Sequence, residues 1–194
     1  MRNILKAATL ESKFPLLAVE SDCIVSKDAD ITVAFEVELP ELFTVTSAEY
    51  AAIHAAWCKA VKVLPDYTVV HKQDWFVKEH YRSRTEGEKL GFLSRSYELH
   101  FNERPFLNHC CYLYLTKTTK ERMRMQSSFS SLCRGFIIPK EVNRDTAARF
   151  LDAAGQFARI VNDTGLVRLR RLSGDEVTGT EEQSGLLEKY LCLS

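Results

Sequence analysis

The segment from Leu16 to Leu39 constrains the fold most, because it contains two strand-like runs joined by a short connection. The second run alternates apolar residues with polar or small ones over nine positions, 31–39. A period of two is typical of a strand with one buried face. The connection, Lys-Asp-Ala-Asp at 27–30, suits a tight turn, since Asp hydrogen-bonds its own backbone. The sequence therefore predicts a β-hairpin near the start of the domain.

Helices and strands are predicted to alternate after this hairpin. A helix capped by Thr46 or Ser47 is expected to run to about Leu64, where Pro65 ends it. Its predicted buried stripe is Tyr50, Ile53, Trp57, Val61 and Leu64. A strand at 67–77 and a polar loop at 82–89 follow. The next helix has the apolar residues Leu90, Leu93, Tyr97 and Phe101 at helical spacing, and Pro105 closes it.

The run from His109 to Thr116 is apolar on both of its alternating faces, which predicts a central strand. A long helix is predicted from Asn143, with Gly165 as its stop. A last strand is predicted at 166–172, with apolar residues alternating with arginines. The order β-β-α-β-α-β-α-β favours an α+β fold. We expect a two-layer sandwich with a mixed or mostly antiparallel sheet and helices packed on one face.

The expected domain organisation divides the chain at residue 172. Residues 1–172 form the predicted N-terminal α+β domain. Residues 173–194 begin with the linker-like SGDEVTGTEEQSG and continue as the start of a following segment of a longer parent protein.

Composition excludes several classes of protein. The 26 basic residues balance the 26 acidic ones, so no global field attracts nucleic acid or an anionic membrane. No apolar run approaches the roughly 20 residues that span a bilayer. Six cysteines are too few for a disulfide-stapled scaffold of this length, which favours free thiols and a reduced, cytoplasmic protein.

No catalytic, cofactor-binding or metal-binding residue can be assigned from the sequence. The eight glycines are scattered and no Gly-Lys dipeptide occurs, so the phosphate-binding loop of nucleotide hydrolases is missing. We therefore expect no enzyme activity and no cofactor in this fragment. His54 and Cys58 have a spacing that could chelate a metal, but their position beside the apolar stripe favours packed core residues. Glu36 and Glu38 are interpreted as the wet face of a strand.

The segment 117–134 is the best candidate for partner binding, because it combines basic residues with adaptable apolar ones. The named candidates are Lys117, Lys120, Arg122, Met123, Arg124, Met125 and Phe129. A solvated loop, a protein-docking segment and a nucleic-acid contact all remain open, although no aromatic residues interleave the basic ones as stacking platforms. Arg168, Arg170 and Arg171 form a second, smaller basic stripe.

Three stretches, Ala18–Tyr50, Val63–Phe76 (VLPDYTVVHKQDWF) and His100–Gln126 (HFNERPFLNHCCYLYLTKTTKERMRMQ), resemble the conjugative-transposon TraG family. That family contains large ATPases similar to the assembly ATPases of type IV secretion systems. The resemblance implies a parent protein with nucleotide motifs downstream of this region. It also implies that this chain is a non-catalytic N-terminal domain without a transmembrane segment, peripheral at the inner membrane through its partners. Those partners would be other conjugation-apparatus proteins and other copies of itself.

Two rival functions remain at this level: a nucleic-acid-binding module of the transfer machinery and a small stand-alone enzyme. A deep polar pocket with perturbed titrating groups would favour the enzyme. Steep salt dependence of binding would favour nucleic acid. An exposed apolar patch would favour a protein partner.

Overall fold

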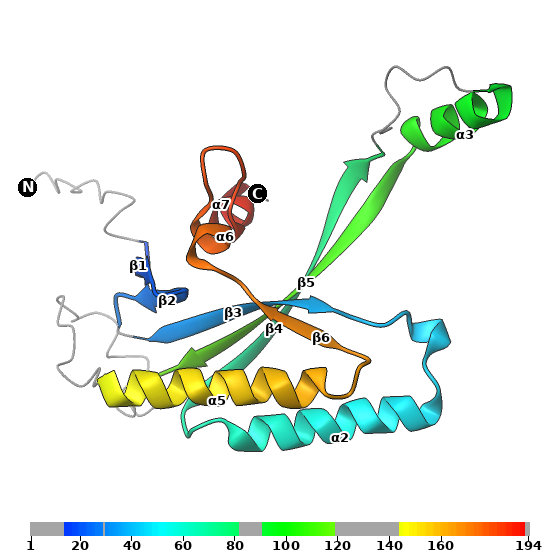
Figure 1. Cartoon of the computed structure of the whole chain (residues 1–194). Coiled ribbons are helices and arrows are strands. Elements are labelled where there is room, and N and C mark those ends of the chain that lie inside the picture. Colours follow the sequence, from blue (N-terminus) through cyan, green and yellow to red (C-terminus); the bar gives the residue numbers. More distant parts are fainter. Residues whose placement is uncertain (1–13, 29, 82–90, 119–143, 193–194) are drawn as a thin grey trace, which may run out of the picture.

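The fold is α+β, with one open antiparallel sheet of six strands, in a computed structural model that describes residues 14–28, 30–81, 91–118 and 144–192 (Figure 1). The predicted loop at 82–89 and most of the basic segment 117–134 lie outside these residues. The strands are β1 (Leu16–Glu20), β2 (Cys23–Ser26), β3 (Ile31–Glu38), β4 (Thr68–His80), β5 (Pro105–Lys117) and β6 (Arg168–Arg171).

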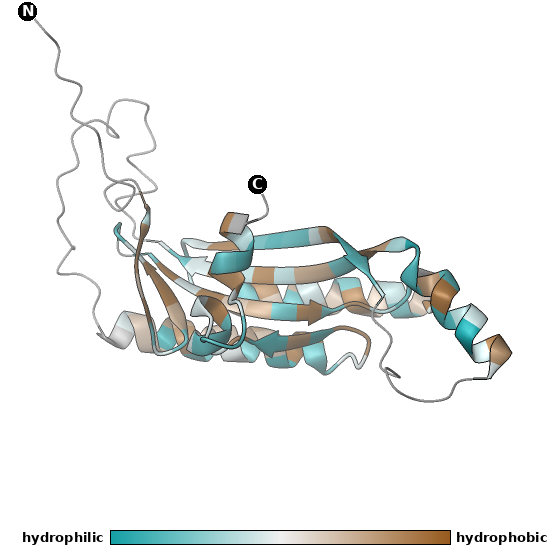
Figure 2. Cartoon of the chain, turned by 90° about the horizontal axis from the view of Figure 1, so that it is seen from above, coloured by the Kyte–Doolittle hydropathy of each residue, from teal (hydrophilic) through white to brown (hydrophobic). Residues whose placement is uncertain are grey.

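The strands are ordered β1-β2-β3-β5-β4 across the sheet. One edge of β3 is shared: β2 pairs with its first residues, and β6 pairs with its last four. The other edge of β3 pairs with β5, which lies between β3 and β4 and is therefore an interior strand, as predicted. Figure 2 shows hydrophobic and hydrophilic residues alternating along the strands.

The first predicted run differs from the structure, because it forms two strands instead of one. β1 and β2 pair antiparallel, with Glu20 opposite Cys23. Between them, Ser21 and Asp22 have φ values of 52° and 58°. Two central residues with positive φ are typical of a two-residue hairpin turn. The turn was missed because the Asn-Gly or Asp-Gly signal of such turns is absent here.

Two long helices, α2 (Ser47–Val63) and α5 (Arg144–Asn162), cover one face of the sheet (Figure 1). A short 3-10 turn, η1 (Leu42–Thr44), precedes α2. α2 begins at a capping box, in which Thr46 and Glu49 bond each other's backbone N–H groups. The core under the helices contains the fully buried side chains Val33, Phe35, Leu113, Leu115, Phe150, Phe157 and Val161.

The buried stripe of α2 is narrower than predicted. Ile53, Trp57 and Leu64 pack against the core, but Tyr50 and Val61 are exposed and Ala60 is the fully buried residue. The face of α2 that meets the core therefore runs through Ala60, and the large residues at the margins of the stripe point into solvent.

The opposite face of the sheet carries α6 (Gly174–Thr178) and α7 (Leu186–Cys192). Val177 and Leu186 are buried there against Ile24, Trp75 and Tyr112. The predicted α+β fold with a mostly antiparallel sheet and long helices on one face is confirmed. The short α6 and α7 are an addition on the other face, and α6 forms within the linker-like residues 173–185. The physical reason is that the strands present apolar side chains on both faces.

The glycines that give residues 173–185 a linker-like composition allow two backbone segments to lie close together. Gly179 and Ser184 form an isolated antiparallel bridge between α6 and α7. A Cβ placed on Gly185 would lie 2.1 Å from the Gly179 nitrogen, so no larger residue fits.

β4 and β5, of 13 residues each, form a hairpin that extends beyond the rest of the sheet. Their pairing runs from Thr68–Lys117 to His80–Pro105, whereas β3 pairs with β5 only as far as Tyr112. The unsupported half of the hairpin (76–81 and 105–110) and helix α3 (Phe92–Asn102) at its tip are called the arm below (Figure 1). α3 has no buried residue, so its regularly spaced apolar residues are exposed.

Candidate functional site

Lys117 is the one predicted partner-binding residue that the structure describes. Its Nζ donates to the carbonyl oxygens of Asp66 (2.6 Å) and Thr118 (3.2 Å) and lies 5.5 Å from the centre of the Tyr67 ring. Lys117 therefore links the residues that directly precede β4 to the end of β5. The other candidates, Lys120, Arg122, Met123, Arg124, Met125 and Phe129, lie outside the described residues.

The arginine stripe of β6 is neutralised by the acidic residues of β3. The register places Arg170 opposite Glu36 and Arg168 opposite Glu38. Arg170 donates through Nε (3.0 Å) and Nη2 (2.6 Å) to the Glu36 carboxylate, and Arg168 lies 3.8 Å from Glu38. Arg171 donates to two backbone carbonyls of the β1–β2 turn. Glu36 and Glu38, which the sequence places on the wet face of a strand, thus each lie beside an arginine.

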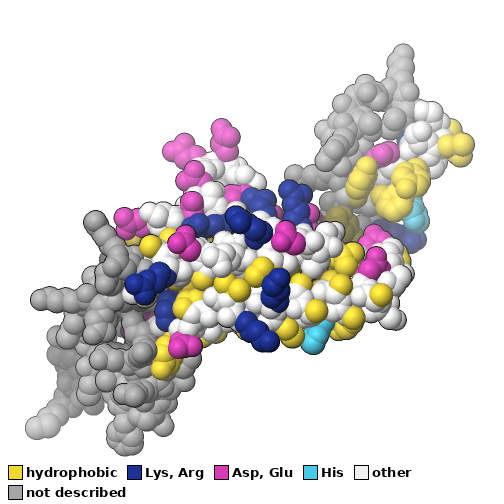
Figure 3. Space-filling view, turned by 60° about the horizontal axis from the view of Figure 1, so that its bottom comes forward, with side chains coloured by type: hydrophobic (Ala, Val, Ile, Leu, Met, Phe, Trp, Pro, Cys, Tyr) yellow, Lys and Arg dark blue, Asp and Glu magenta, His cyan; other side chains and the backbone are white. Residues whose placement is uncertain are grey.

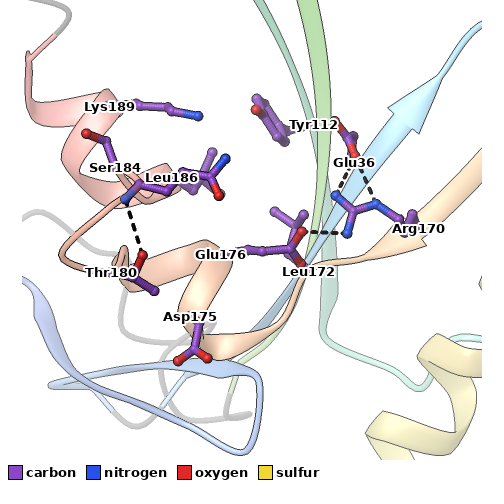
Figure 4. Close-up of a pocket in the computed structure, with 11 residues that line it drawn as sticks. Glu36, Tyr112, Arg170, Leu172, Asp175, Glu176, Thr180, Ser184, Leu186 and Lys189 are labelled. Atoms are coloured by element: carbon purple, nitrogen blue, oxygen red, sulfur yellow. Dashed lines mark hydrogen bonds and ion pairs between the residues drawn. The ribbon is translucent and has the colours of Figure 1, made fainter.

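A polar pocket of about 210 Å³ lies between the sheet and the α6–α7 unit (Figure 4). At its floor Arg170 bridges Glu36 and Glu176, with Nη1 2.6 Å from the Glu176 carboxylate. The hydrogen bonds that Arg170 donates to Glu36 and Glu176 raise the pKa of Arg170. The Ser173 backbone N–H, and then Arg170, lower the pKa of Glu176. The charges at the floor satisfy one another, so the cluster fastens α6 to the sheet.

A second, apolar groove of about 380 Å³ lies on the same face, beside α7. Its walls come from β1, from the outward residues of the central strands and from α7, including Leu16, Ile24, Tyr114, Leu187 and Tyr190. Burial raises the pKa of Tyr114, so its hydroxyl stays protonated at neutral pH. The groove offers apolar contact and no reactive pair.

Asp74 lies at the base of the arm, where it accepts hydrogen bonds from Lys72 and from Nε2 of His109 (2.9 Å). These bonds, Lys72 first, lower the pKa of Asp74 to about 2. Burial, followed by a hydrogen bond to Asp74, raises the pKa of Cys111 to about 11. A Cys, a His and an Asp are thus neighbours, but a thiol with a raised pKa is a poor nucleophile.

His54 and Cys58 on α2 are both exposed, with Sγ 3.8 Å from Nε2. The prediction that they are packed core residues is wrong, because the buried stripe runs through Ala60 instead. Across the described ranges, no group of three His, Cys, Asp or Glu side chains could hold a metal ion. No helix in the described part of the chain is long and apolar enough to cross a membrane.

The arm carries the most unusual surface of the described residues. Eight large apolar side chains there are 42–83% exposed: Phe76, Phe92, Leu93, Tyr97, Leu99, Phe101, Phe106 and Leu107. We call this set the arm patch; its yellow side chains gather at the far end of the molecule in Figure 3. A buried aromatic side chain covers roughly 150–250 Å². Large apolar side chains that gather on one projection, rather than being scattered singly, mark interaction sites.

Aromatic contacts organise part of this surface. The Tyr97 and Phe101 rings lie 4.5 Å apart on α3, and Tyr81 meets Phe101 edge-on at 6.2 Å. Lower on the arm, Phe76 stacks on His109 at 4.7 Å. The apolar spacing of α3 was visible in the sequence, but its exposure was not, because exposure depends on what the helix meets in space.

Residues 3–55 match the model of a family described as a domain of unknown function, B. Theta gene description (DUF3875). Within the described residues the match covers β1 to β3 and the first half of α2. No curated protein matches the chain.

Proposed function

We propose that this chain is a non-catalytic interaction domain that docks a protein partner through the arm patch. The observation that carries the proposal is the gathering of large apolar side chains on a projecting arm. Surfaces of this composition mark interaction sites in soluble proteins, since their exposure to water is unfavourable. Aromatic residues also dominate the binding energy of many interfaces.

The shape of the patch favours a particular mode of docking. α3 is a helix of 11 residues whose exposed Leu93, Tyr97 and Phe101 are spaced by four. Residues with this spacing lie on one helix face and insert together into an apolar groove of a partner. Arg95 and Glu98 on the same helix supply polar residues for the rim of such an interface. The partner is therefore a protein with an apolar groove that takes a helix.

The resemblance to TraG-type proteins suggests where this docking takes place. On that basis the chain is the N-terminal docking domain of a conjugative DNA-transfer ATPase. Its partner is a protein of the conjugation apparatus at the inner membrane, and the domain lies on the cytoplasmic side. The alternative function, a nucleic-acid-binding module, is less favoured than protein docking. Free cations supply most of the affinity for phosphates, and the arginine stripe of β6 is neutralised.

The test replaces Leu93 by Asp and Tyr97 by Ser in the full-length protein. DNA transfer between cells is expected to fall at least about tenfold, since losing one interface hot spot costs about 2 kcal/mol or more. The matched control is Tyr50→Ser, which removes a Tyr of similar exposure (66% against 65%) from α2. Both variants should keep the melting temperature of the 194-residue chain, because exposed substitutions change stability little.

Normal transfer by the arm variant would refute docking through the patch. A reduced transfer by Tyr50→Ser alone would place the partner on α2 instead. The assignment to an ATPase has its own check. ATP should not raise the melting temperature of this fragment, because a ligand stabilises the state that it binds. The same gene should encode a Gly-Lys-Ser/Thr loop downstream.

A further inference from the structure

β4 is the last strand of the sheet, and its outer edge is long and regular. It pairs with β5 over 13 consecutive residue pairs without a bulge. No strand in the described part of the chain pairs with its other side. The strand contains no proline, so none of the backbone N–H groups that point to its outer edge is missing. An edge of this kind offers a template for another strand.

We infer that a second copy of this chain pairs with β4 along this edge, antiparallel, about a two-fold axis at Phe76. In such a pairing the same strand meets itself, and residues at equal distances before and after position 76 lie opposite each other. Opposite residues also lie on the same face of the joined sheet. The side chains of β4 complement each other in this register.

On the α2–α5 face, Asp74 meets Lys78 of the second copy, and the symmetry makes this ion pair twice. Phe76 meets Phe76, which buries a side chain that is 66% exposed in the single chain. Lys78 is exposed in the single chain, and Asp74 is an exposed carboxylate that accepts from Lys72 and His109 and has lone pairs left for a further cation. Opposite charges and aromatic pairs placed directly across from each other both stabilise strand pairing.

On the other face, Trp75 meets Val77 and Gln73 meets Glu79. The first pair is apolar on both sides and the second is polar on both sides. Neighbouring registers are less favourable: a centre at 74 places Asp74 opposite Asp74, and a centre at 75 places Lys72 opposite Lys78. A centre at Gln73 brings Lys72 opposite Asp74, but these two already pair within one chain, so little is gained.

This inference concerns a surface separate from α3, and it does not depend on the proposed docking partner. A pairing centred at Phe76, where the arm begins, keeps the first residues of β4, near α2, away from the axis. Two copies would present their α3 helices at opposite ends of one continuous sheet. The assembly would therefore carry two α3 helices, while Phe76 of each arm patch is covered at the axis.

Disulfide trapping tests the register directly. In Phe76→Cys the two introduced thiols face each other with Cα atoms about 4.5–5.5 Å apart, within disulfide reach. Mild oxidation should give a covalent dimer that reductant reverses. Lys78→Cys is the matched control on the same face. Its two thiols would be four residues apart along the strands, about 13 Å, too far to bridge. Wild-type protein, run in parallel, accounts for the native cysteines.

A charge exchange tests the pairing without introducing thiols. In Lys78→Glu, a carboxylate at 78 lies opposite Asp74 of the other copy at both symmetry-related places. In Asp74→Lys, two ammonium groups lie opposite each other at the same two places. Each variant alone should sediment as a monomer, whereas a mixture of the two should form a heterodimer with both ion pairs restored. Lys59→Glu, an equal charge change on the exposed side of α2, should dimerise like the wild type.

The outcomes decide the matter. Trapping at position 76 together with dimerisation of the mixed charge variants supports the inference. Trapping by Gln73→Cys instead would overturn the register, and a wild-type chain that stays monomeric at high concentration would overturn self-pairing. The Leu93→Asp variant should still trap at position 76, so failure of the docking proposal and failure of this one are distinguishable.

Discussion

Replacing Phe157 by Ala should remove a large part of the stability of this domain. The Phe157 side chain is fully buried on α5, and its ring meets the Trp57 ring of α2 edge-on at 5.4 Å and 69°. Truncating a buried Phe costs about 3–5 kcal/mol. The edge-on pair contributes about 0.5–1.5 kcal/mol beyond area burial. We therefore expect a loss of about 4–5 kcal/mol, a large part of the roughly 5–15 kcal/mol that stabilises a domain.

Guanidinium unfolding followed by tryptophan fluorescence measures this loss. The midpoint should fall while the slope stays constant, since the surface exposed on unfolding hardly changes. The matched control is Tyr50→Ala, which removes an aromatic ring from the exposed margin of α2 and should change stability by less than about 0.5 kcal/mol. A loss below about 2 kcal/mol for Phe157→Ala would mean that α2 and α5 do not form a close-packed layer.

Three further predictions concern the other face, the titrating groups and the thiols. Val177→Asp should release the α6–α7 unit at a cost of several kcal/mol, because it buries an unpaired charge. The fluorescence emission of Trp75 should then shift to the red, and an unchanged spectrum would contradict this prediction. On acidification, the free energy of unfolding should decline below pH 4.5. The folded protein lowers the pKa of Glu176 and of Asp74, so each carboxylate contributes its full stabilisation above its pKa in the unfolded chain, 4.5 and 3.8. That stabilisation is lost as the pH falls through the pKa of the folded protein, which is about 2 for Asp74. In Glu176→Gln, the melting temperature should depend less on pH in the upper part of this pH range. Thiol titration without reductant should count six groups after denaturation, with exposed Cys58 reacting before buried Cys23 and Cys111 in the native state.

Local sequence signals determined several elements with good accuracy. Thr46 and Glu49 supply both halves of a capping box, and α2 begins where they predict. The two-sided apolar pattern of 109–116 identified β5 as an interior strand, because only a strand covered on both faces can carry such residues. Gly165 closes the long helix with a φ of +68°, a conformation that glycine adopts without strain.

Burial of individual faces was harder to predict, because it depends on the partner surface. The apolar spacing of α3 is as regular as that of α2, yet α2 rests on the core and α3 lies beyond the end of the supported sheet. The residues that distinguish the two helices belong to other elements. A single helix therefore cannot indicate whether its apolar stripe is a core or an interaction surface.

Pairings between distant residues were decided by the tertiary structure alone. The Arg170–Glu36 contact joins residues 134 positions apart, and it exists because β6 pairs with β3 in one particular register. Asn162 likewise bonds the backbone N–H and C=O of Leu169 with its side-chain amide, which fixes the last strand to the end of α5. The sequence by itself determined the kinds of element and their caps, since these depend on neighbours along the chain. The tertiary structure decided which charges are neutralised and which apolar side chains stay exposed, since these depend on residues brought together only by folding.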